Sequence, residues 1–200
     1  QIAIAIDTGI IQAQLTHIFD TDKKTAENLV TKLKQKPIIV ENVHLLSSNP
    51  VDLIVEAASQ QAVSDNALSI LQNRRYLMIM SAGALLDESV FEIISDACRE
   101  FKKTVYLPSG AISGIDAIKS ARNELESVTI TTTKHPRSLK GAKFFETSNL
   151  DIDNISDETI IFEGTASEAV RLFPKNVNVS ALLSLAGLGS HETIVKVIAN

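Results

Sequence analysis

The sequence predicts an α/β fold, a doubly wound parallel sheet, that gives way to an α+β region with a mixed sheet. Up to residue 107, short apolar runs alternate with amphipathic helical patterns, as in the βαβ units of a parallel sheet. Small residues stand where these predicted strands end. After a glycine-containing stretch at Tyr106–Ile118, the strands become threonine-rich and more widely spaced. The two halves differ in kind, and we place their boundary between residues 108 and 109.

The composition is that of an ordinary globular protein. Of the 200 residues, 44% are hydrophobic and 22% are charged, with a formal net charge of −5. Because no basic run is present, binding to nucleic acid is not expected. The single cysteine, Cys98, excludes an internal disulfide and fits a reducing compartment, so we expect a cytoplasmic protein. The sequence has no apolar run of about 20 residues, so a membrane span is not expected.

The chain reads as an interior piece of a longer protein, because it starts at Gln1 without methionine and stops at Asn200 after a strand-like run. Residues Gln1–Asp7 alternate isoleucine and alanine, which permits a short strand. Alanine favours a helix, however, and Gly9 suits a helix end, so we expect the end of a helix there. The Asp7-Thr8-Gly9 triplet also occurs in aspartic proteases. Their catalysis needs two such carboxylates, and no second copy of the triplet follows.

A strand at Gln14–Phe19 followed by Asp20 fits the second strand of a dinucleotide-binding unit. An acid in that position accepts hydrogen bonds from the adenosine ribose and lies about 20 residues beyond the glycine-rich turn. That turn would then fall at or just before Gln1. Asp22 competes for this role and equally suits the N-cap of a helix at Lys23–Leu33. A solvated acid at the end of a strand is the open alternative for Asp20.

The next elements continue the alternation of strands and helices. The run Val51–Glu56 is apolar enough for a strand that is buried on both faces. Small residues at Ala57-Ala58-Ser59 and Ser81-Ala82-Gly83 leave room for a flat ligand over the sheet edge, although tight turns would explain them as well. The other expected strands are Ile38–Val40, Tyr76–Met80 and Thr104–Leu107, and the expected helices are Gln61–Gln72 and Ser89–Phe101.

The stretch Tyr106–Ile118 starts as a strand and ends as a helix, with Gly110 and Gly114 between them. Glycine permits positive φ angles and the close approach of another molecule. A Pro-Ser-Gly break after a buried strand places backbone N–H groups at the carboxyl end of the sheet, where open α/β sheets bind ligands. We therefore expect this hinge to join a nucleotide-binding domain, residues 1–108, to a substrate domain, residues 109–200. The same pattern also suits a plain strand–turn–helix connection.

The second half predicts a mixed or antiparallel sheet with helices. Val128–Lys134 alternates and is rich in threonine, which is typical of a half-exposed strand. Asp151–Glu158 is acidic and polar, which predicts a solvated loop. A helix at Thr165–Phe173 is expected to begin near Thr165 or Ser167. The remaining expected elements are strands at Thr159–Glu163 and Thr193–Ala199 and a helix at Val179–Ala186.

Four motifs closely resemble those of the L-aspartate dehydrogenase family, and the likeness extends over nearly the whole chain. They are EAASQQAV at Glu56–Val63, SGAISGIDA at Ser109–Ala117, FEGTASEA at Phe162–Ala169 and FPKNVNV at Phe173–Val179. The resemblance implies an N-terminal Rossmann domain, a C-terminal α+β domain that makes a homodimer contact, and oxidation of L-aspartate with NAD or NADP. It also implies a product, iminoaspartate, that feeds NAD biosynthesis or hydrolyses to oxaloacetate and ammonia.

The resemblance further implies that Ala111 lies against the nicotinamide end of the cofactor and that an asparagine of the FPKNVNV motif contacts the cofactor or substrate. We prefer Asn178 to Asn176, and turn chemistry after a proline is the alternative for both. An asparagine amide can fix a carboxamide because it donates and accepts together. Asp20 favours NAD over NADP, since a carboxylate repels a 2′-phosphate. The other expected cofactor contacts are Ala57, Ala58, Ser59, Ser81, Ala82, Gly83 and Gly110.

No catalytic residue is assigned within the chain. The resemblance places the family's catalytic histidine, in an Asn-x-His-Glu-Ile run, after the last residue, and its glycine-rich phosphate loop before the first. His191 is a weaker candidate, because its position before a strand matches a variable loop in the family. Lys134 and Lys175 are candidates for the cationic lining that two substrate carboxylates require, with solvated lysines as the alternative. No histidine pairs with a cysteine or a second histidine at metal-ligand spacing, so no metal site is expected.

Two other functions fit the sequence. One is a related Rossmann reductase of the dihydrodipicolinate reductase or homoserine dehydrogenase kind, which should lack the combined SGAISG and FPKNVN motifs. The other is a module that binds a dinucleotide without catalysis. A panel of substrates separates the first from an aspartate dehydrogenase, and titration with NADH combined with turnover assays separates the second.

Overall fold

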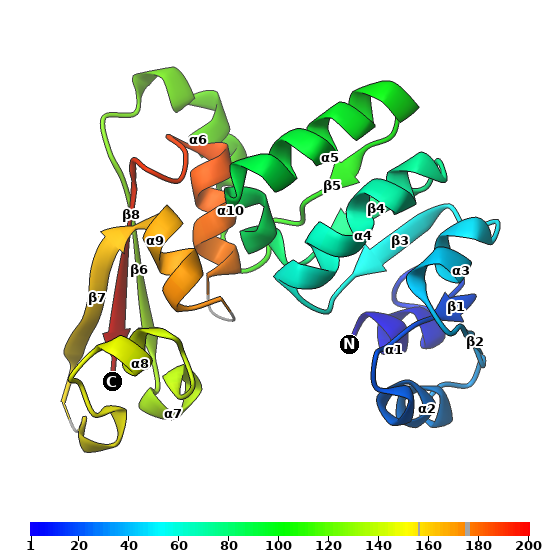
Figure 1. Cartoon of the computed structure of the whole chain (residues 1–200), viewed down its shortest axis with the longest axis horizontal. Helices are drawn as coiled ribbons and strands as arrows, with labels where there is room; N and C mark the ends of the chain where they lie inside the picture. The colour runs from blue at the N-terminus through cyan, green and yellow to red at the C-terminus, as the bar shows by residue number, and fades with distance from the viewer. Residues whose placement is uncertain (156, 175–176) are drawn as a thin grey trace.

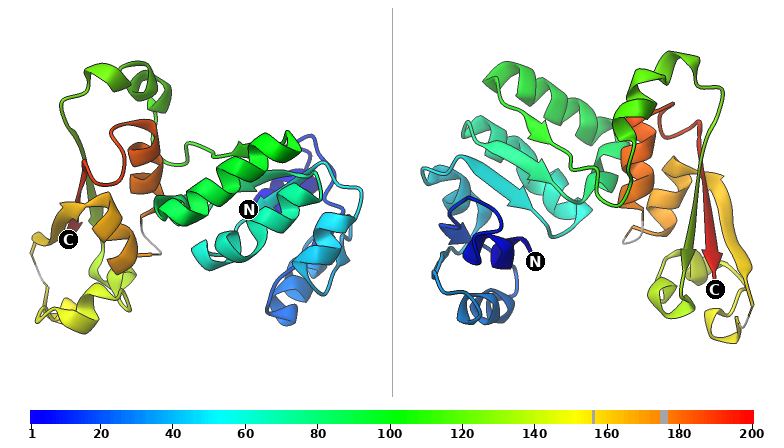
Figure 2. Two further views of the ribbon diagram at one scale, coloured as in Figure 1. Left: turned by 45° about the horizontal axis from the view of Figure 1, so that its top comes forward. Right: turned by 180° about the vertical axis from the view of Figure 1, so that it is seen from behind.

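The computed structural model describes residues 1–155, 157–174 and 177–200, which form two lobes (Figure 1). The N-terminal lobe holds parallel strands with helices around them, and the C-terminal lobe holds a separate three-stranded sheet. Helix α10 (Asn178–Ala186) stands between the two lobes in each view (Figures 1 and 2). This arrangement confirms the predicted α/β region followed by an α+β region.

The described strands of the N-terminal lobe are parallel, as predicted, but they form two separate ladders. β1 (His17–Ile18) pairs with β2 (Ile38–Ile39). β4 (Tyr76–Ile79) lies between β3 (Leu53–Glu56) and β5 (Val105–Tyr106). The strands are shorter than the apolar runs that predicted them, because only residues with a hydrogen-bonded partner in the neighbouring strand form a ladder.

The helices predicted for the N-terminal lobe are present, and their ends follow local capping signals. The interpretation of the first residues as a helix is confirmed, since α1 spans Ile2–Asp7 and is followed by Gly9 with φ +78°. Asp22 is an N-cap whose carboxylate accepts the Lys24 N–H. The other helical elements are α2 Lys23–Thr31, α3 Val43–Ser48, α4 Gln60–Gln72, the 3₁₀ turn η1 Ala82–Leu86 and α5 Glu88–Phe101. Helix α3 was not predicted, because six residues are too few to show a helical period.

The core of the N-terminal lobe lies between the β3–β4–β5 ladder and helices α4 and α5. Ile54, Leu77 and Ile79 supply its strand side chains. The expectation that β3 is buried on both faces is wrong, because Leu53 and Val55 are 40% and 37% exposed. Successive side chains of a strand point to opposite faces, and the helices that bury Ile54 cover only one of them.

The Asp7-Thr8-Gly9 triplet has a structural role. The Asp7 carboxylate accepts the Lys34 N–H at 2.8 and 2.9 Å and the Gln35 N–H at 2.8 Å. These backbone hydrogen bonds, with that of Lys34 foremost, lower the pKa of Asp7. Asp7 thus ties the end of α1 to the turn after α2, which explains the triplet without a protease function.

The sheet of the C-terminal lobe is mixed, as predicted. β8 (Thr193–Ala199) lies in its centre, parallel to β6 (Val128–Lys134) and antiparallel to β7 (Thr159–Thr165). A register shift between Ile160 and Phe162 interrupts the β7–β8 ladder. The bounds expected for β6 and β8 are confirmed, and β7 continues beyond the expected end at Glu163.

Helices α9 and α10 cover one face of this sheet (Figure 1). Helix α9 (Ala166–Leu172) begins after Thr165, one of the two starts expected for it, where Thr165 and Glu168 form a capping box. The Thr165 N–H and then its hydroxyl donate to the Glu168 carboxylate and lower its pKa. The shorter elements are α6 Ile115–Ser120, η2 Arg122–Glu124, α7 Pro136–Leu139, α8 Phe144–Thr147 and η3 Ile152–Asn154. The turn η3 lies within the predicted acidic loop.

An aromatic cluster forms the centre of the C-terminal core. Phe173, with no exposed surface, stacks on Phe144 at a centroid distance of 5.3 Å and meets Phe162 edge-on at 5.6 Å. The buried Val195 and Val197 of β8 join this cluster. Phe173 therefore anchors the segment that leads to α10. No helix in the described part of the chain is long and apolar enough to cross a membrane.

Candidate functional site

The two small-residue segments lie side by side, because they follow β3 and β4, which pair in register as far as Glu56 and Ile79. Ala57-Ala58-Ser59 is exposed and leads into α4, where Ser59 Oγ accepts the Ala62 N–H at 3.1 Å. Ser81-Ala82-Gly83 is buried and begins η1. The structure therefore brings all six of these predicted residues to the carboxyl edge of the sheet, where α/β proteins bind ligands.

Two hydrogen bonds join this edge to the C-terminal lobe. The Gly83 N–H donates to Asn178 Oδ1 at 3.2 Å, and Gln60 Nε2 donates to the Pro174 carbonyl at 2.9 Å. Gln60 is the first residue of α4, and Asn178 is the first residue of α10. Asn178 and Gly83 are thus neighbours in space, although 95 positions separate them in the chain.

Gly83 is required for reasons of space. A Cβ atom at this position would lie 2.4 Å from Gln60 Nε2 and 3.0 Å from Val170 Cγ2. The Gln60 amide could withdraw only by giving up its hydrogen bond to Pro174. A side chain at Gly83 would therefore break the hydrogen bond between Gln60 and Pro174.

The hinge segment runs beside α10. Gly110 and Gly114 have φ +63° and +78°, in the left-handed region that glycine allows. A Cβ atom at Gly110 would lie 3.9 Å from Leu182 Cδ1, one helical turn along α10 from Asn178. Ala111, the next residue, is exposed. The hinge and the Gly83–Asn178 contact hence adjoin the same helix.

The Asn178 side chain suits a nicotinamide dinucleotide at this edge. Its Oδ1 atom accepts from Gly83, whereas its Nδ2 has no hydrogen-bond partner among the described residues. An amide nitrogen in this state can donate to a carboxamide oxygen such as that of nicotinamide. The small, exposed Ala57 and Ala58 leave space for a flat ring at the same edge.

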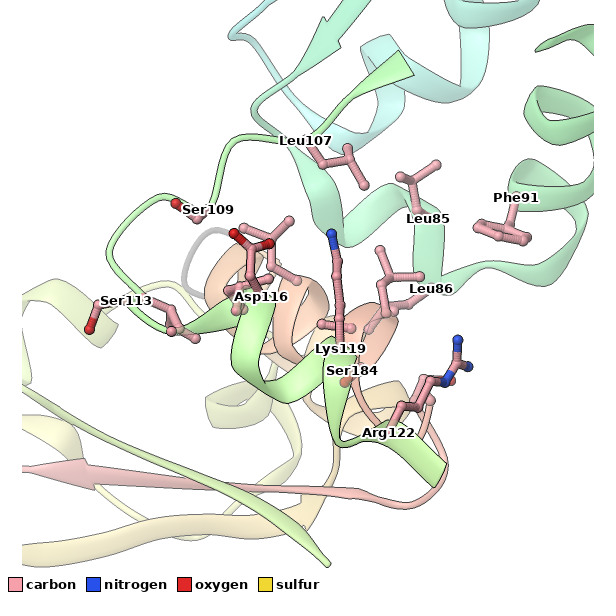
Figure 3. Close-up of a pocket in the computed structure, with 18 of the residues that line it drawn as sticks. Leu85, Leu86, Phe91, Leu107, Ser109, Ser113, Asp116, Lys119, Arg122 and Ser184 are labelled. Atoms are coloured by element: carbon pink, nitrogen blue, oxygen red, sulfur yellow. The ribbon is translucent and has the colours of Figure 1, made fainter. Parts of the chain in front are cut away.

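A larger cavity, of about 660 Å³, lies along the other half of α10 (Figure 3). Its walls come from η1, the start of α5, the hinge, α6 and the Leu182–Ala186 part of α10. None of the residues predicted to bind cofactor or substrate lines it. We therefore place the candidate site at the Gly83–Asn178 contact, where the strand ends meet the C-terminal lobe.

A smaller hollow of about 290 Å³ adjoins Gly83 and carries two cations, Lys143 and Arg171, that sequence patterns did not mark. Arg171 falls between two of the family motifs and Lys143 lies in none, so no sequence signal pointed to them. Asp87 lines the same hollow, and hydrogen bonds at the start of α5, with that of the Ser89 hydroxyl foremost, lower its pKa.

Asp20 and Lys134 lie at strand ends, and no hydrogen bond or ion pair in the described structure links them to the Gly83–Asn178 contact. Asp20 is exposed after β1, and its Oδ1 accepts the Asp22 N–H at 2.9 Å. Lys134 ends β6, where its carbonyl accepts the Asn200 N–H at 3.1 Å. Their roles in binding stay predictions.

His191 is exposed in the loop before β8, with its Nε2 3.7 Å from the Glu88 carboxylate. It lies beyond the C-terminal end of α10, and Asn178 lies at the other end, about 13 Å of helix away. No hydrogen bond or ion pair among the described residues links His191 to the Gly83–Asn178 contact, and its catalytic role stays a prediction. Lys175 and Asn176, the other two candidates from sequence, lie outside the described residues.

Cys98 lies on α5, remote from these contacts. Burial raises the pKa of its thiol, which fits a packing residue better than a nucleophile. Within residues 1–155, 157–174 and 177–200, no group of three or more His, Cys, Asp and Glu side chains could hold a metal ion.

Comparisons with known proteins decide the family. Residues 116–200 match the family described as "Aspartate dehydrogenase, C-terminal", and residues 3–108 match "Homoserine dehydrogenase, NAD binding domain". An L-aspartate dehydrogenase of Nitrosopumilus maritimus is 62% identical over 200 residues, which cover the whole chain and 74% of that protein. The chain belongs to the L-aspartate dehydrogenase family.

More distant members of the family agree. An L-aspartate dehydrogenase of Methanococcoides burtonii is 44% identical over 198 residues, or 98% of this chain and 72% of that one. Among solved structures, the aspartate dehydrogenase of Thermotoga maritima matches with a TM-score of 0.71 at 28% identity, covering 94% of this chain and 80% of that one. The family resemblance inferred from the four motifs is confirmed.

Proposed function

We propose that the protein oxidises L-aspartate to iminoaspartate with NAD or NADP. The observation that carries this proposal is the 62% identity to an L-aspartate dehydrogenase over the whole chain. The site supports it, because small residues and an asparagine amide converge at the carboxyl edge of a parallel sheet. The match of residues 3–108 to an NAD-binding domain supports the choice of cofactor.

The chain's own residues bind and orient the reactants. NAD(P), when bound, supplies the hydride acceptor, which must face the substrate Cα in a site with little water. Asn178 Nδ2 would donate to the carboxamide of the bound cofactor. The Gly83 N–H, which donates to Asn178 Oδ1, would hold the amide in the orientation that this requires. The other proposed cofactor contacts are Asp20, Ala57, Ala58, Ser59, Ser81, Ala82, Gly110 and Ala111, with Asn176 as the alternative to Asn178.

The two lobes divide this work. We propose that residues 1–108 bind the dinucleotide and that residues 109–200 carry the substrate side of the site. Lys134 and Lys175 remain the candidates for the substrate carboxylates, and Lys143 and Arg171 join them because they flank Gly83. Each of these four cations can be replaced by glutamate in turn, and the replacement that most raises the KM for L-aspartate would identify the residue that binds the substrate.

The activity is tested on the full-length protein with a panel of acids. We expect L-aspartate to support formation of NADH or NADPH, and D-aspartate, L-glutamate and L-homoserine to support little. Oxaloacetate and ammonia should accumulate in equal amounts as the imine hydrolyses. Turnover with another acid in place of L-aspartate would contradict the proposal, and NADH binding without any turnover would point to a non-catalytic module.

The reactivity of the product bears on which enzyme uses it and in which compartment. Iminoaspartate is unstable in water, so we propose that an enzyme of NAD biosynthesis consumes it directly. Use of a soluble dinucleotide and a single cysteine without a disulfide fit the cytoplasm. Supplying the purified protein with such a consuming enzyme should divert the product from oxaloacetate.

We also propose a homodimer formed through the open face of the C-terminal sheet. On this face the exposed Thr129, Thr131 and Thr133 of β6 stand beside Ile194, Lys196 and Ile198 of β8, and Ile160 of β7 is 53% exposed. Helices α9 and α10 cover the opposite face. A row of half-exposed isoleucines and threonines suits a second copy of the same sheet face.

Thr131→Arg should separate this dimer, because it adds a second, bulky cation beside Lys196 at the middle of the proposed contact. Light scattering after size exclusion should give a dimeric mass for the native protein and a monomeric mass for the variant. Thr104→Arg, an equal change at another exposed position, should stay dimeric. A dimeric Thr131→Arg variant would rule out this face.

A further inference from the structure

The Glu56 carboxylate accepts four hydrogen bonds at the carboxyl edge of the sheet. Oε1 accepts the Ala58 N–H at 2.7 Å, the Ser59 N–H at 3.0 Å and the Ser81 hydroxyl at 2.9 Å. Oε2 accepts the Ser81 N–H at 3.0 Å. One carboxylate therefore accepts from donors in two separate chain segments, three of them on Oε1 and one on Oε2.

The position of Glu56 explains why it can reach donors on two strands. It is the last residue of β3 and stands opposite Ile79, the last residue of β4. Ala58 and Ser59 follow it in its own chain segment, whereas Ser81 follows β4. The side chain therefore links the ends of two neighbouring strands beyond the point where their ladder stops.

The Gln60–Pro174 and Gly83–Asn178 hydrogen bonds both start from residues that follow the donors to Glu56 in the chain. Ser59 is the N-cap of α4, and the following residue, Gln60, donates to the Pro174 carbonyl. Ser81 precedes η1, and Gly83, two residues later, donates to Asn178 Oδ1. The two acceptors are the Pro174 carbonyl, just after Phe173, and the side chain of Asn178, the first residue of α10. One carboxylate therefore supports both contacts.

From this geometry we infer that Glu56 is a positioning residue for the dinucleotide. It orients the Ser81–Gly83 backbone, whose Gly83 N–H holds the Asn178 amide, and the Ser59–Gln60 segment, whose Gln60 amide holds the Pro174 carbonyl. The inference rests on the proposed function, since it assumes that the cofactor lies at this edge. Glu56 acts through Gly83 and Asn178 and does not touch the reacting atoms. Its loss should weaken cofactor binding more than it slows turnover at saturation.

Glu56→Gln tests the hydrogen bonds without changing the volume of the side chain. The amide keeps one oxygen but turns an N–H₂ group towards donors that need an acceptor. We expect Kd for NADH, followed by NADH fluorescence, and KM for NAD(P) to rise by about tenfold to a hundredfold, with a smaller change in kcat. KM for L-aspartate at saturating cofactor should change less.

Two variants complete the test. Glu56→Asp keeps the charge but shortens the reach, so it should fall between the native protein and Glu56→Gln. Glu100→Gln, the same change at an exposed position on α5, should leave Kd and KM unaltered. The Kd for NADH describes the folded molecules alone. If Glu56 had only a structural role, its substitution would therefore lower the melting temperature and leave this Kd unchanged.

The outcomes are distinct. An active native protein whose Glu56→Gln variant keeps the native Kd and KM would overturn the inference. A native protein without aspartate turnover would overturn the proposed function, whatever Glu56 does to NADH binding. Should Glu56→Gln fail to fold, Glu56→Asp, which keeps the charge but shortens the reach to the Ser81 hydroxyl, decides in its place. A several-fold rise in Kd supports the inference, and an unchanged Kd overturns it.

Discussion

Asn178→Ala is expected to lower kcat/KM for L-aspartate oxidation by about a hundredfold, because a small loss of orientation at a reacting ring has an effect of that order. The change removes the acceptor of the Gly83 N–H and the Nδ2 donor together. It leaves the buried Gly83 N–H without its partner, so a modest loss of stability should accompany it. Steady-state kinetics of the full-length protein, with NAD or NADP varied, measure the effect.

Asn178→Asp separates the two roles of this side chain. Aspartate is nearly isosteric and still accepts from Gly83, but it has no donor for a carboxamide. If Nδ2 binds the cofactor, Asn178→Asp should be nearly as impaired as Asn178→Ala. If the side chain only joins the lobes, Asn178→Asp should keep most of its activity, and the proposed cofactor contact would be wrong. Asn28→Ala, at an exposed position on α2, controls for loss of an asparagine.

Phe173→Ala is expected to lower the free energy of unfolding by about 3–5 kcal/mol, as typical for truncating a fully buried phenylalanine. Phe173 has no exposed surface and contacts both Phe144 and Phe162. Since whole domains are stable by only about 5–15 kcal/mol, the variant should be marginal. Urea unfolding followed by circular dichroism measures the change.

Phe91→Ala is the matched control, because the same atoms are removed from a side chain that is 45% exposed. It should change the free energy of unfolding by about 0.5 kcal/mol. Phe173→Leu, which refills much of the volume, should fall between the two. A loss of less than about 1 kcal/mol in Phe173→Ala would show that the aromatic cluster does not anchor the segment before α10.

Local patterns were sufficient for most of the secondary structure. The alternation in Val128–Lys134 and the apolar run at Thr193–Ala199 predicted both strands with correct bounds. Capping chemistry at Asp22 and Thr165 marked the starts of two helices. The wrong prediction of burial for β3 has a different origin from the missed helix α3, which is too short to show a period. Burial of Leu53 and Val55 depends on which faces of the sheet are covered, and a run of apolar residues carries no information about that.

The candidate site was predictable only in part. The small residues after β3 and β4 were predicted as site residues from their position at strand ends, because the carboxyl ends of parallel strands meet at one edge of the sheet. No sequence pattern indicated that Gln60, Pro174 or Arg171 belongs to the site. Their importance comes from contacts across the lobe boundary, which span more than a hundred positions in the case of Gln60 and Pro174.

The amino-acid sequence by itself determined the fold class, the two unlike halves and the family, because these depend on periodicity and on motifs that are short and local. Only the tertiary structure decided which residues lie together at the candidate site. The pairing of Gly83 with Asn178 and the four donors around Glu56 arise where separate segments meet. A hydrogen bond depends on the distance and direction between two groups in space, and the order of residues along the chain specifies neither of them.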